Sequence, residues 1–435
     1  MKTTYRATAR FVACLLASLV LLLPYLAAAQ QTVTLEEAVQ LALDRSPQML
    51  QQEQALENAA LAERSAWGAF LPSVSASSSG SLRSANILDP NTGQIIGGSS
   101  DSYSAGLSGR VDLFRGGSRF VELDRTEADM QVALARRESQ RFAVVLTTKN
   151  LFFASLRQSD LLDVSRRREE QAEQNLRIVR ARSQLGRATI SDSLRARLDL
   201  VNARQAVLQG ETALRGARFA LGRQVGESAP VISARPDDLD PSELPLTEAE
   251  IMEFAEASAP TVVAAAYLTS AAAASVRAAR TGYLPTLSMS TGYNWNNQDR
   301  SFTGGSTSWS LGLSVSYPIF NNFQRESSLD RAQFSQRLAR LQEDDIRLAA
   351  RQEADAALYN LRTAQRAIEI AEEASLVAGE DLRVVRERYS VGVATILDIL
   401  ISQSAADQAS VDVVTSRYDY VLARAELESI LGREL

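Results

Sequence analysis

The sequence is poor in the residues that most enzymes use for catalysis. Its 435 residues include no histidine, which excludes a histidine-ligated zinc site, a histidine general base and a Ser-His-Asp triad. The single cysteine, Cys14, lies in an apolar run near the N-terminus, where no catalytic thiol is expected. Lysine occurs only as Lys2 and Lys149, and Lys149 belongs to no phosphate-binding or Ser-x-x-Lys motif. We therefore predict no catalytic residue, no cofactor and no metal.

Residues 1–29 have the pattern of a secretory signal peptide. Three basic residues precede an apolar stretch over 11–26, and Ala27-Ala28-Ala29 supplies a small-residue cleavage site. The alternative is a retained membrane anchor, which Pro24 and the small-residue end disfavour. Cleavage after Ala29 removes the three basic residues and changes the net charge from −6 to −9. No other run of about 18 apolar residues follows, so we expect no membrane-spanning helix.

The rest of the chain repeats itself. Three residues recur at an offset of 213, namely Thr34, Pro47 and Pro72 as Thr247, Pro260 and Pro285. Further along the offset is 206, and it relates Phe114, Gly186, Thr189 and Asp192 to Phe320, Gly392, Thr395 and Asp398. One change of loop length between two aligned copies explains both offsets. We predict a first repeat at 30–222, a proline-rich linker at 223–246 and a second repeat at 247–435.

Each copy has the pattern of a helix, two strands and a long helical hairpin. The strands are expected at about 70–84 and 102–114, and at about 284–296 and 308–320. Residues 118–185 lack glycine and proline, and a helix of that length reaches about 100 Å. Gly186 and Gly392 then end the long helices, so the hairpins are expected at 118–221 and 323–431. The arginine-rich run at 166–170 indicates a solvated helix face, since an acidic chain does not favour nucleic-acid binding.

The strands alternate between apolar and polar residues. Trp309, Leu311 and Leu313 alternate with serine and glycine, which fits either a soluble sheet with one buried face or a strand that faces lipid. Two details favour lipid: each segment is about 10 residues long, and the aromatic residues cluster at both ends. We predict a lipid-facing girdle formed by Trp295, Trp309, Tyr283 and Tyr317.

Four strands cannot close a barrel alone. The smallest single-chain barrels have about eight strands, and lipid does not tolerate an open sheet edge. The chain must therefore oligomerise, either as a dimer with eight strands or as a trimer with twelve. The helical hairpins attached to the strands would then form a tube or bundle outside the membrane.

The mature chain resembles the TolC-like outer-membrane efflux proteins. The segments that carry the resemblance are Thr34-Leu35-Glu36-Glu37-Ala38 with Ser46-Pro47, Leu113-Phe114-Arg115-Gly116-Gly117, Tyr283-Leu284-Pro285, and the run from Tyr389 to Asp398. The resemblance implies a mainly α fold with a membrane β-barrel, as a homotrimer in the cell outer membrane with a periplasmic α-helical tunnel. It also implies an exit duct for a tripartite efflux pump or type I secretion system, joined to an inner-membrane transporter by a periplasmic adaptor.

The resemblance also gives roles to residues at the hairpin tips. Residues that match the family's adaptor-docking turns are Arg182, Gly186, Thr189, Arg388, Gly392 and Thr395. Asp398 matches an acidic residue that narrows the closed tunnel, and Asp192 occupies the equivalent place in the first copy, where a solvated helix surface is the alternative. Ile401 and Ala394 depart from the family pattern, so the gating contacts are not carried over. We hypothesise that three Asp398 carboxylates form an anionic constriction that the adaptor opens.

Two other classes of protein remain as alternatives. A periplasmic coiled-coil scaffold or adaptor would share the signal peptide and the hairpins but not the amphipathic strands, and it would fractionate as a soluble protein. An exported hydrolase with a carboxylate pair is a remote alternative, because no glycine-rich loop frames such a pair. The sequence does not specify whether the cargo is a drug, a metal, another small molecule or a protein.

Overall fold

The structure, a computed structural model, describes residues 32–88, 91–236, 239–242, 244–298 and 303–435. The expected signal peptide at 1–29 lies outside the described residues. The chain divides into two units. The hairpin unit consists of the described residues up to 50 together with 139–255 and 351–435. The sheet unit consists of residues 51–138 and 256–350.

The two copies have the same order of elements. The first contains α2 (Leu35–Arg45), α3 (Pro47–Gly68), β2 (Ser73–Leu88), β3 (Ile95–Arg115), α4 (Ser118–Gln184) and α5 (Ile190–Gln224). The second contains α6 (Glu248–Ser258), α7 (Pro260–Thr281), β5 (Thr286–Asn297), β6 (Ser306–Ser316), α8 (Gln324–Ser390) and α9 (Ile396–Leu431). Pro47 and Pro260 begin α3 and α7, a position where the missing N–H of proline does not matter.

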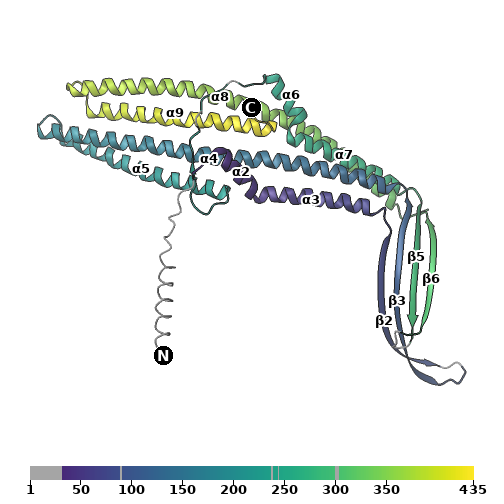
Figure 1. The fold of residues 1–435 in the computed structure, drawn as a ribbon. Coiled ribbons are helices and arrows are strands. Elements are labelled where there is room, and N and C mark those ends of the chain that lie inside the picture. The colour runs from purple at the N-terminus through teal and green to yellow at the C-terminus, as the bar shows by residue number, and fades with distance from the viewer. Residues whose placement is uncertain (1–31, 89–90, 237–238, 243, 299–302) are drawn as a thin grey trace, which may run out of the picture. The chain divides into compact units, whose positions relative to one another are not determined.

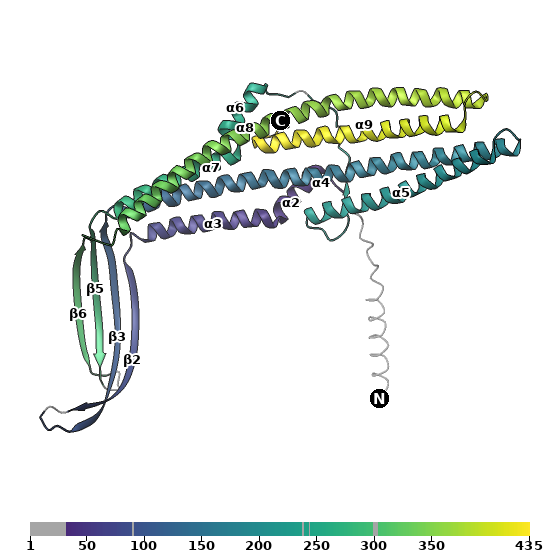
Figure 2. The same cartoon turned by 180° about the vertical axis from the view of Figure 1, so that it is seen from behind.

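Two antiparallel helix pairs form the hairpin unit. Figures 1 and 2 show α4 beside α5 and α8 beside α9. Tyr418 of α9 is buried, packs against Phe153 of α4 and donates a hydrogen bond to the Asp160 carboxylate (2.8 Å). In the segment expected as a linker, β4 (Ile232–Ser233) pairs in parallel with β1 (Thr32–Val33). The buried core of this unit thus joins the first copy to the second.

The sheet unit contains one antiparallel sheet in the order β2-β3-β5-β6. Its edges are β2 and β6. The register places successive residues of each strand on opposite faces. Between Asp112 and Phe114 the register shifts by one residue, a β-bulge at Leu113.

The two faces of this sheet differ sharply in chemistry. One face carries serine, glycine and asparagine, with Ser75 paired to Ser108 and Ser79 to Ser104 through hydroxyl hydrogen bonds of 2.8 Å. The other face carries the large apolar side chains, which are exposed in the single chain, including Leu107, Tyr293, Trp309, Leu311, Leu313 and Val315. A sheet of this kind needs an apolar environment on one face and water on the other.

Both copies pass from strand to helix through the same backbone geometry. Gly116 and Gly117 have φ of 62° and 78°, and Asn322 and Phe323, at the 206 offset, have φ of 57° and 60°. Arg119 donates a hydrogen bond to the Asp112 carbonyl in the first copy. Its equivalent, Arg325, donates to the Pro318 carbonyl (3.0 Å) in the second. These two arginines hold the turn in each copy.

One described segment, Glu248–Thr281, is long and apolar enough to span a membrane by length and composition alone. We expected none. The segment comprises α6 and α7, which are interrupted at Ala259 before Pro260. Ile251 and Ala255 of α6 are buried in the core of the hairpin unit. Within α7, Val262 and Ala274 are buried in the sheet unit. Part of the apolar composition therefore reflects packing inside the protein.

Candidate functional site at the hairpin tips

The two hairpin tips have the same turn. Gly186 and Gly392 adopt left-handed conformations with φ of 71° and 87°, as glycine commonly does after a helix. The Arg187 N–H donates to the Arg182 carbonyl, and the Val393 N–H donates to the Arg388 carbonyl, both at 2.9 Å. Gly186 and Gly392 are exposed. The turns thus present their backbone outward at the end of each hairpin.

Each turn leads into a helix that begins with a capping box. Thr189 accepts a hydrogen bond from the Asp192 N–H (3.1 Å), while the Asp192 carboxylate accepts from the Thr189 N–H (2.9 Å). In the second copy, Thr395 accepts from the Asp398 N–H (3.3 Å), and Asp398 accepts from the Thr395 N–H (2.7 Å). Sequence reasoning missed this role, although the Thr-x-x-acid spacing is a readable capping signal.

The capping hydrogen bonds also set the charge of both aspartates. The backbone N–H and then the hydroxyl of Thr395 lower the pKa of Asp398 from its ordinary value of 3.8. Thr189 lowers the pKa of Asp192 in the same way. Because both aspartates lie at the surface of the single chain, each tip carries a solvent-facing negative charge at neutral pH.

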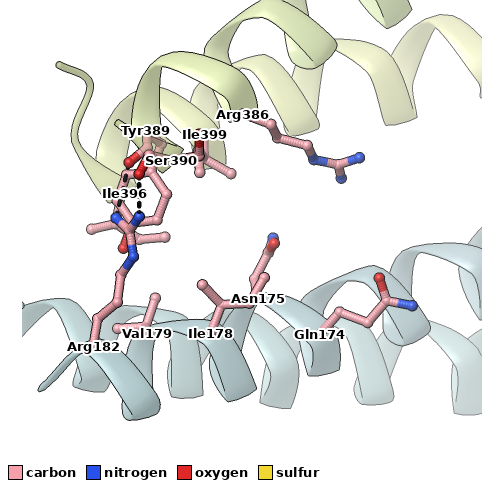
Figure 3. A pocket seen from close by; sticks show the side chains of 10 residues that line it. All are labelled: Gln174, Asn175, Ile178, Val179, Arg182, Arg386, Tyr389, Ser390, Ile396 and Ile399. Atoms are coloured by element: carbon pink, nitrogen blue, oxygen red, sulfur yellow. Dashed lines mark hydrogen bonds between the residues drawn. The ribbon is translucent and has the colours of Figure 1, made fainter. Parts of the chain in front are cut away.

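Arg182 connects the tip of the first hairpin to that of the second. Its guanidinium donates to the Tyr389 carbonyl (2.9 Å) and to the Ser390 carbonyl (2.8 Å), and it lies 4.3 Å from the Tyr389 ring centroid. Figure 3 shows Arg182 reaching from α4 to these residues of α8. Arg388, its equivalent in the second copy, is exposed and attracts Asp398. The two tip arginines therefore have different environments.

A cavity of about 200 Å³ lies behind this contact, between α4 and the second hairpin. Ile178, Val179 and Ile399 supply apolar lining. Further along, Asn175 donates to Gln403 (2.7 Å), and both side chains are buried. Ala394 packs in the apolar cluster at this level, and Ile401 is 60% exposed.

Next along α4, one arginine lies between two aspartates. Arg168 is 3.8 Å from Asp199 of α5 and 3.4 Å from Asp407 of α9. Burial raises the pKa of both aspartates, and Arg168 opposes the shift. We expected the run at 166–170 to be a solvated face, but Arg168 joins three helices. Sequence reasoning found neither this cluster nor Asn175–Gln403. The internal repeat could not reveal the Asn175–Gln403 pair, because the residues at the equivalent positions in the other copy, Asp381 and Arg197, are not amides.

The predicted girdle residues lie at both ends of the sheet. Trp309 pairs with Tyr293 on the apolar face and is 70% exposed. Trp295, on the same face, donates to the Gly304 carbonyl (2.8 Å). Tyr317, just after β6, is 56% exposed, and Tyr283, before β5, lies beneath the Arg325 guanidinium at 5.0 Å.

Within the described residues, no group of three or more His, Cys, Asp or Glu could hold a metal ion.

Long paired helices and a two-faced sheet with open edges define an outer-membrane channel protein. The sequence model of the family described as outer membrane efflux protein matches residues 38–227 and 252–433. The chain belongs to this family, and its place is the outer membrane. The predicted family and fold class are confirmed.

Individual relatives agree with this assignment. The chain is 24% identical to the probable efflux pump outer membrane protein TtgC of Pseudomonas putida, over 83% of this chain and 75% of that one. It is 27% identical to Protein CyaE of Bordetella pertussis, over 91% and 82%. The CmeC outer membrane channel of Campylobacter jejuni has the same fold, with a TM-score of 0.80 at 19% identity, over 92% and 85%. The predicted function as an outer-membrane efflux channel is confirmed.

Proposed function

We propose that three copies of this chain form a passive exit duct, which a periplasmic adaptor opens and an inner-membrane transporter supplies. The observation that carries the proposal is the sheet with edge strands β2 and β6, one apolar face and one face of serine, glycine and asparagine. Lipid requires such edges to be paired. An eight-stranded barrel is just wide enough for side chains, whereas a larger barrel leaves a lumen. Three copies of the sheet therefore fit a duct better than two.

Exposed apolar seams on the helices support assembly from several copies. On α5, the side chains of Leu194, Leu198 and Leu208 are 60%, 61% and 64% exposed. They follow a heptad spacing opposite the buried residues of the same helix. On α8, Ile370 and Val377 are seven residues apart and 67% and 60% exposed. A neighbouring copy is the natural cover for these seams, and it would extend the two hairpins into a tunnel.

The tips supply the gate of the proposed duct. Three copies would bring three Asp398 carboxylates near the axis, each ionised because Thr395 holds the pKa low. Separation of the hairpins would first have to break the Arg182 hydrogen bonds to Tyr389 and Ser390. The exposed turns around Gly186, Thr189, Arg388, Gly392 and Thr395 are the proposed docking surface for the adaptor. The aromatic residues Trp295, Trp309, Tyr283 and Tyr317 are proposed to face lipid.

Conductance in planar bilayers tests the duct and the gate separately. The purified protein should insert and give channels that pass cations preferentially and that divalent cations block. Asp398→Asn should weaken both properties. Asp192→Asn, which changes the equivalent capping residue, distinguishes a place in the constriction, which would weaken them too, from a solvated helix surface, which would not. Channels with unchanged selectivity and block in Asp398→Asn would exclude the carboxylate ring. Absence of any channel from the assembled protein would contradict the duct itself.

A further inference from the structure

The base of the sheet's polar face carries a charged cluster that the duct does not require. Arg110 lies opposite Ser73 and Ser290, and its Nε is 3.7 Å from the Asp112 carboxylate. Arg115 approaches the other oxygen of Asp112 at 3.6 Å. The arginine side chains are 68% and 57% exposed, and the aspartate side chain is 29% exposed. The cluster has a net positive charge of one per chain.

The bulge at Leu113 brings Arg115 into this cluster. Asp112 pairs with Ser288 on the polar face, and Phe114 pairs with Leu287 on the apolar face. With uninterrupted alternation, Phe114 would fall on the polar face and Arg115 on the apolar one. The extra residue reverses both placements, so Arg115 pairs with Thr286 on the polar face. The bulge thus gathers three charged residues on one face and keeps the phenylalanine off it.

The part of this face next to the cluster is otherwise uncharged. Over 73–82, 101–109, 287–297 and 306–316, the polar-face residues are serine, glycine and asparagine. In three copies the cluster would therefore form a charged ring at one end of this neutral stretch of the wall. Fields from such a ring extend about 10 Å at 0.1 M salt and about 30 Å at 0.01 M.

The second copy shows that these charges do not make the strand-to-helix turn. Arg119 and Arg325 are equivalent and make equivalent hydrogen bonds to carbonyls, so they are the arginines that hold the turn. At the same offset, however, Arg110 and Arg115 correspond to Ser316 and Asn321. The same turn forms there without them. Their charge is therefore available for another role.

We infer that Arg110 and Arg115 form a cationic collar where solutes enter the barrel, and that this collar concentrates anionic solutes. The inference rests on the proposed duct, because it places the polar face in the lumen. A solute that crosses the proposed duct would meet both the acidic tips and the collar. The aspartates would repel a negatively charged solute at the tips, and the arginines would attract it at the collar. A positively charged solute would be attracted at the tips and repelled at the collar.

Single cysteines provide a local readout of the collar, since the chain has no cysteine after Cys14. Ser290→Cys places a thiol directly opposite Arg110. The reaction rates of an anionic and a cationic methanethiosulfonate with this thiol are compared in reconstituted trimers at low salt. Arg110→Gln should lower the ratio of anionic to cationic rate by at least about twofold, Asp112→Asn should raise it, and added salt should shrink both changes.

Ser306→Cys is the matched control on the same face. It lies opposite Asn296, six residues along β5 from Ser290, which is about 20 Å away. At 0.1 M salt its ratio should not respond to Arg110→Gln. Arg110→Lys should retain the wild-type ratio at Ser290→Cys. An unchanged ratio in Arg110→Gln, in trimers that conduct and react at both cysteines, would overturn the collar. Thiols that react only after detergent solubilisation would instead contradict the duct.

Discussion

At the scale of single residues, the strand-to-helix turns show how one backbone geometry is met by different side chains. The first copy uses two glycines, whereas the second places Asn322 and Phe323 in left-handed conformations. For residues with a side chain this conformation costs about 1–2 kcal/mol each. Phe323 stacks edge-on against Phe320 at 5.4 Å, a contact that offsets part of this strain. The two glycines are nevertheless not equivalent.

Alanine substitutions should separate the two glycines. A Cβ at Gly116 would lie 2.6 Å from the Thr281 carbonyl oxygen and 2.8 Å from Leu284 Cβ, whereas a Cβ at Gly117 meets nothing within 4 Å. Gly117→Ala should therefore destabilise by about 1 kcal/mol through strain alone. Gly116→Ala adds an overlap worth about 1–3 kcal/mol more. Thermal melting followed by circular dichroism measures both, and equal melting temperatures would contradict the assignment.

At the scale of elements, polar contacts join the first hairpin to the second. Those on the tip side of the Tyr418–Asp160 hydrogen bond include the Arg182 hydrogen bonds to the α8 turn, the Asn175–Gln403 pair and the Arg168 cluster. Apolar side chains such as Val179 and Ile399 lie between them. Buried polar pairs of this kind fix the register of helices. They therefore specify one alignment of the two hairpins, which apolar packing alone would not do.

The Arg168 cluster should make this interface depend on pH. Burial raises the pKa of both Asp199 and Asp407, and the charge of Asp199 raises the pKa of Asp407 further. Arg168 opposes both shifts, and Arg386 opposes the shift of Asp407. In the folded state these carboxyls therefore hold protons at a pH where the unfolded chain has lost them. Stability then falls as pH rises above the ordinary value of 3.8 through the raised values. Acidification from neutral pH toward the ordinary value of 3.8 should therefore strengthen the interface.

Melting temperatures measured in steps from pH 7 down to the ordinary value of 3.8 test this expectation. The wild-type protein should gain stability over this range relative to Asp407→Asn, which removes one titrating group while preserving shape. Below the ordinary value of 3.8 the sign reverses, because Asp192 and Asp398 have lowered pKa values and their caps are lost on protonation. An Asp407→Asn profile that parallels the wild type over this whole range would disprove the role of the cluster.

Much of the element order could be predicted from the sequence, and much of the site could not. The glycines at 186 and 392 locate the two turns, because Gly186 ends a long segment without glycine or proline and because the 206 offset relates it to Gly392. By contrast, β2 extends to Leu88 and β3 begins at Ile95, beyond the strands expected at 70–84 and 102–114. Backbone pairing continued past the end of the apolar alternation. The Arg168 cluster depends on contacts between distant helices, which no local spacing encodes.

At the scale of the whole molecule, assembly should depend on surfaces that the single chain leaves exposed. Leu198 on the α5 seam is 61% exposed, so a charge there should leave the isolated chain folded. Leu198→Asp should dissociate the trimer while helicity is retained, because the assembled seam would bury a carboxylate. Analytical ultracentrifugation in detergent with circular dichroism measures both, and Leu198→Met is the matched control. Intact trimers in Leu198→Asp would show that the copies meet elsewhere.

The serine and glycine face of the sheet has a kinetic consequence for the proposed duct. Hydroxyls paired to one another, as in Ser75–Ser108 and Ser79–Ser104, line this stretch of the wall. An uncharged solute that slides past them exchanges one weak hydrogen bond for another, so this stretch creates no deep energy well. Flux of such a solute through the barrel should then rise in proportion to supply without reaching saturation. Any maximum velocity measured for export would belong to the transporter that feeds the duct.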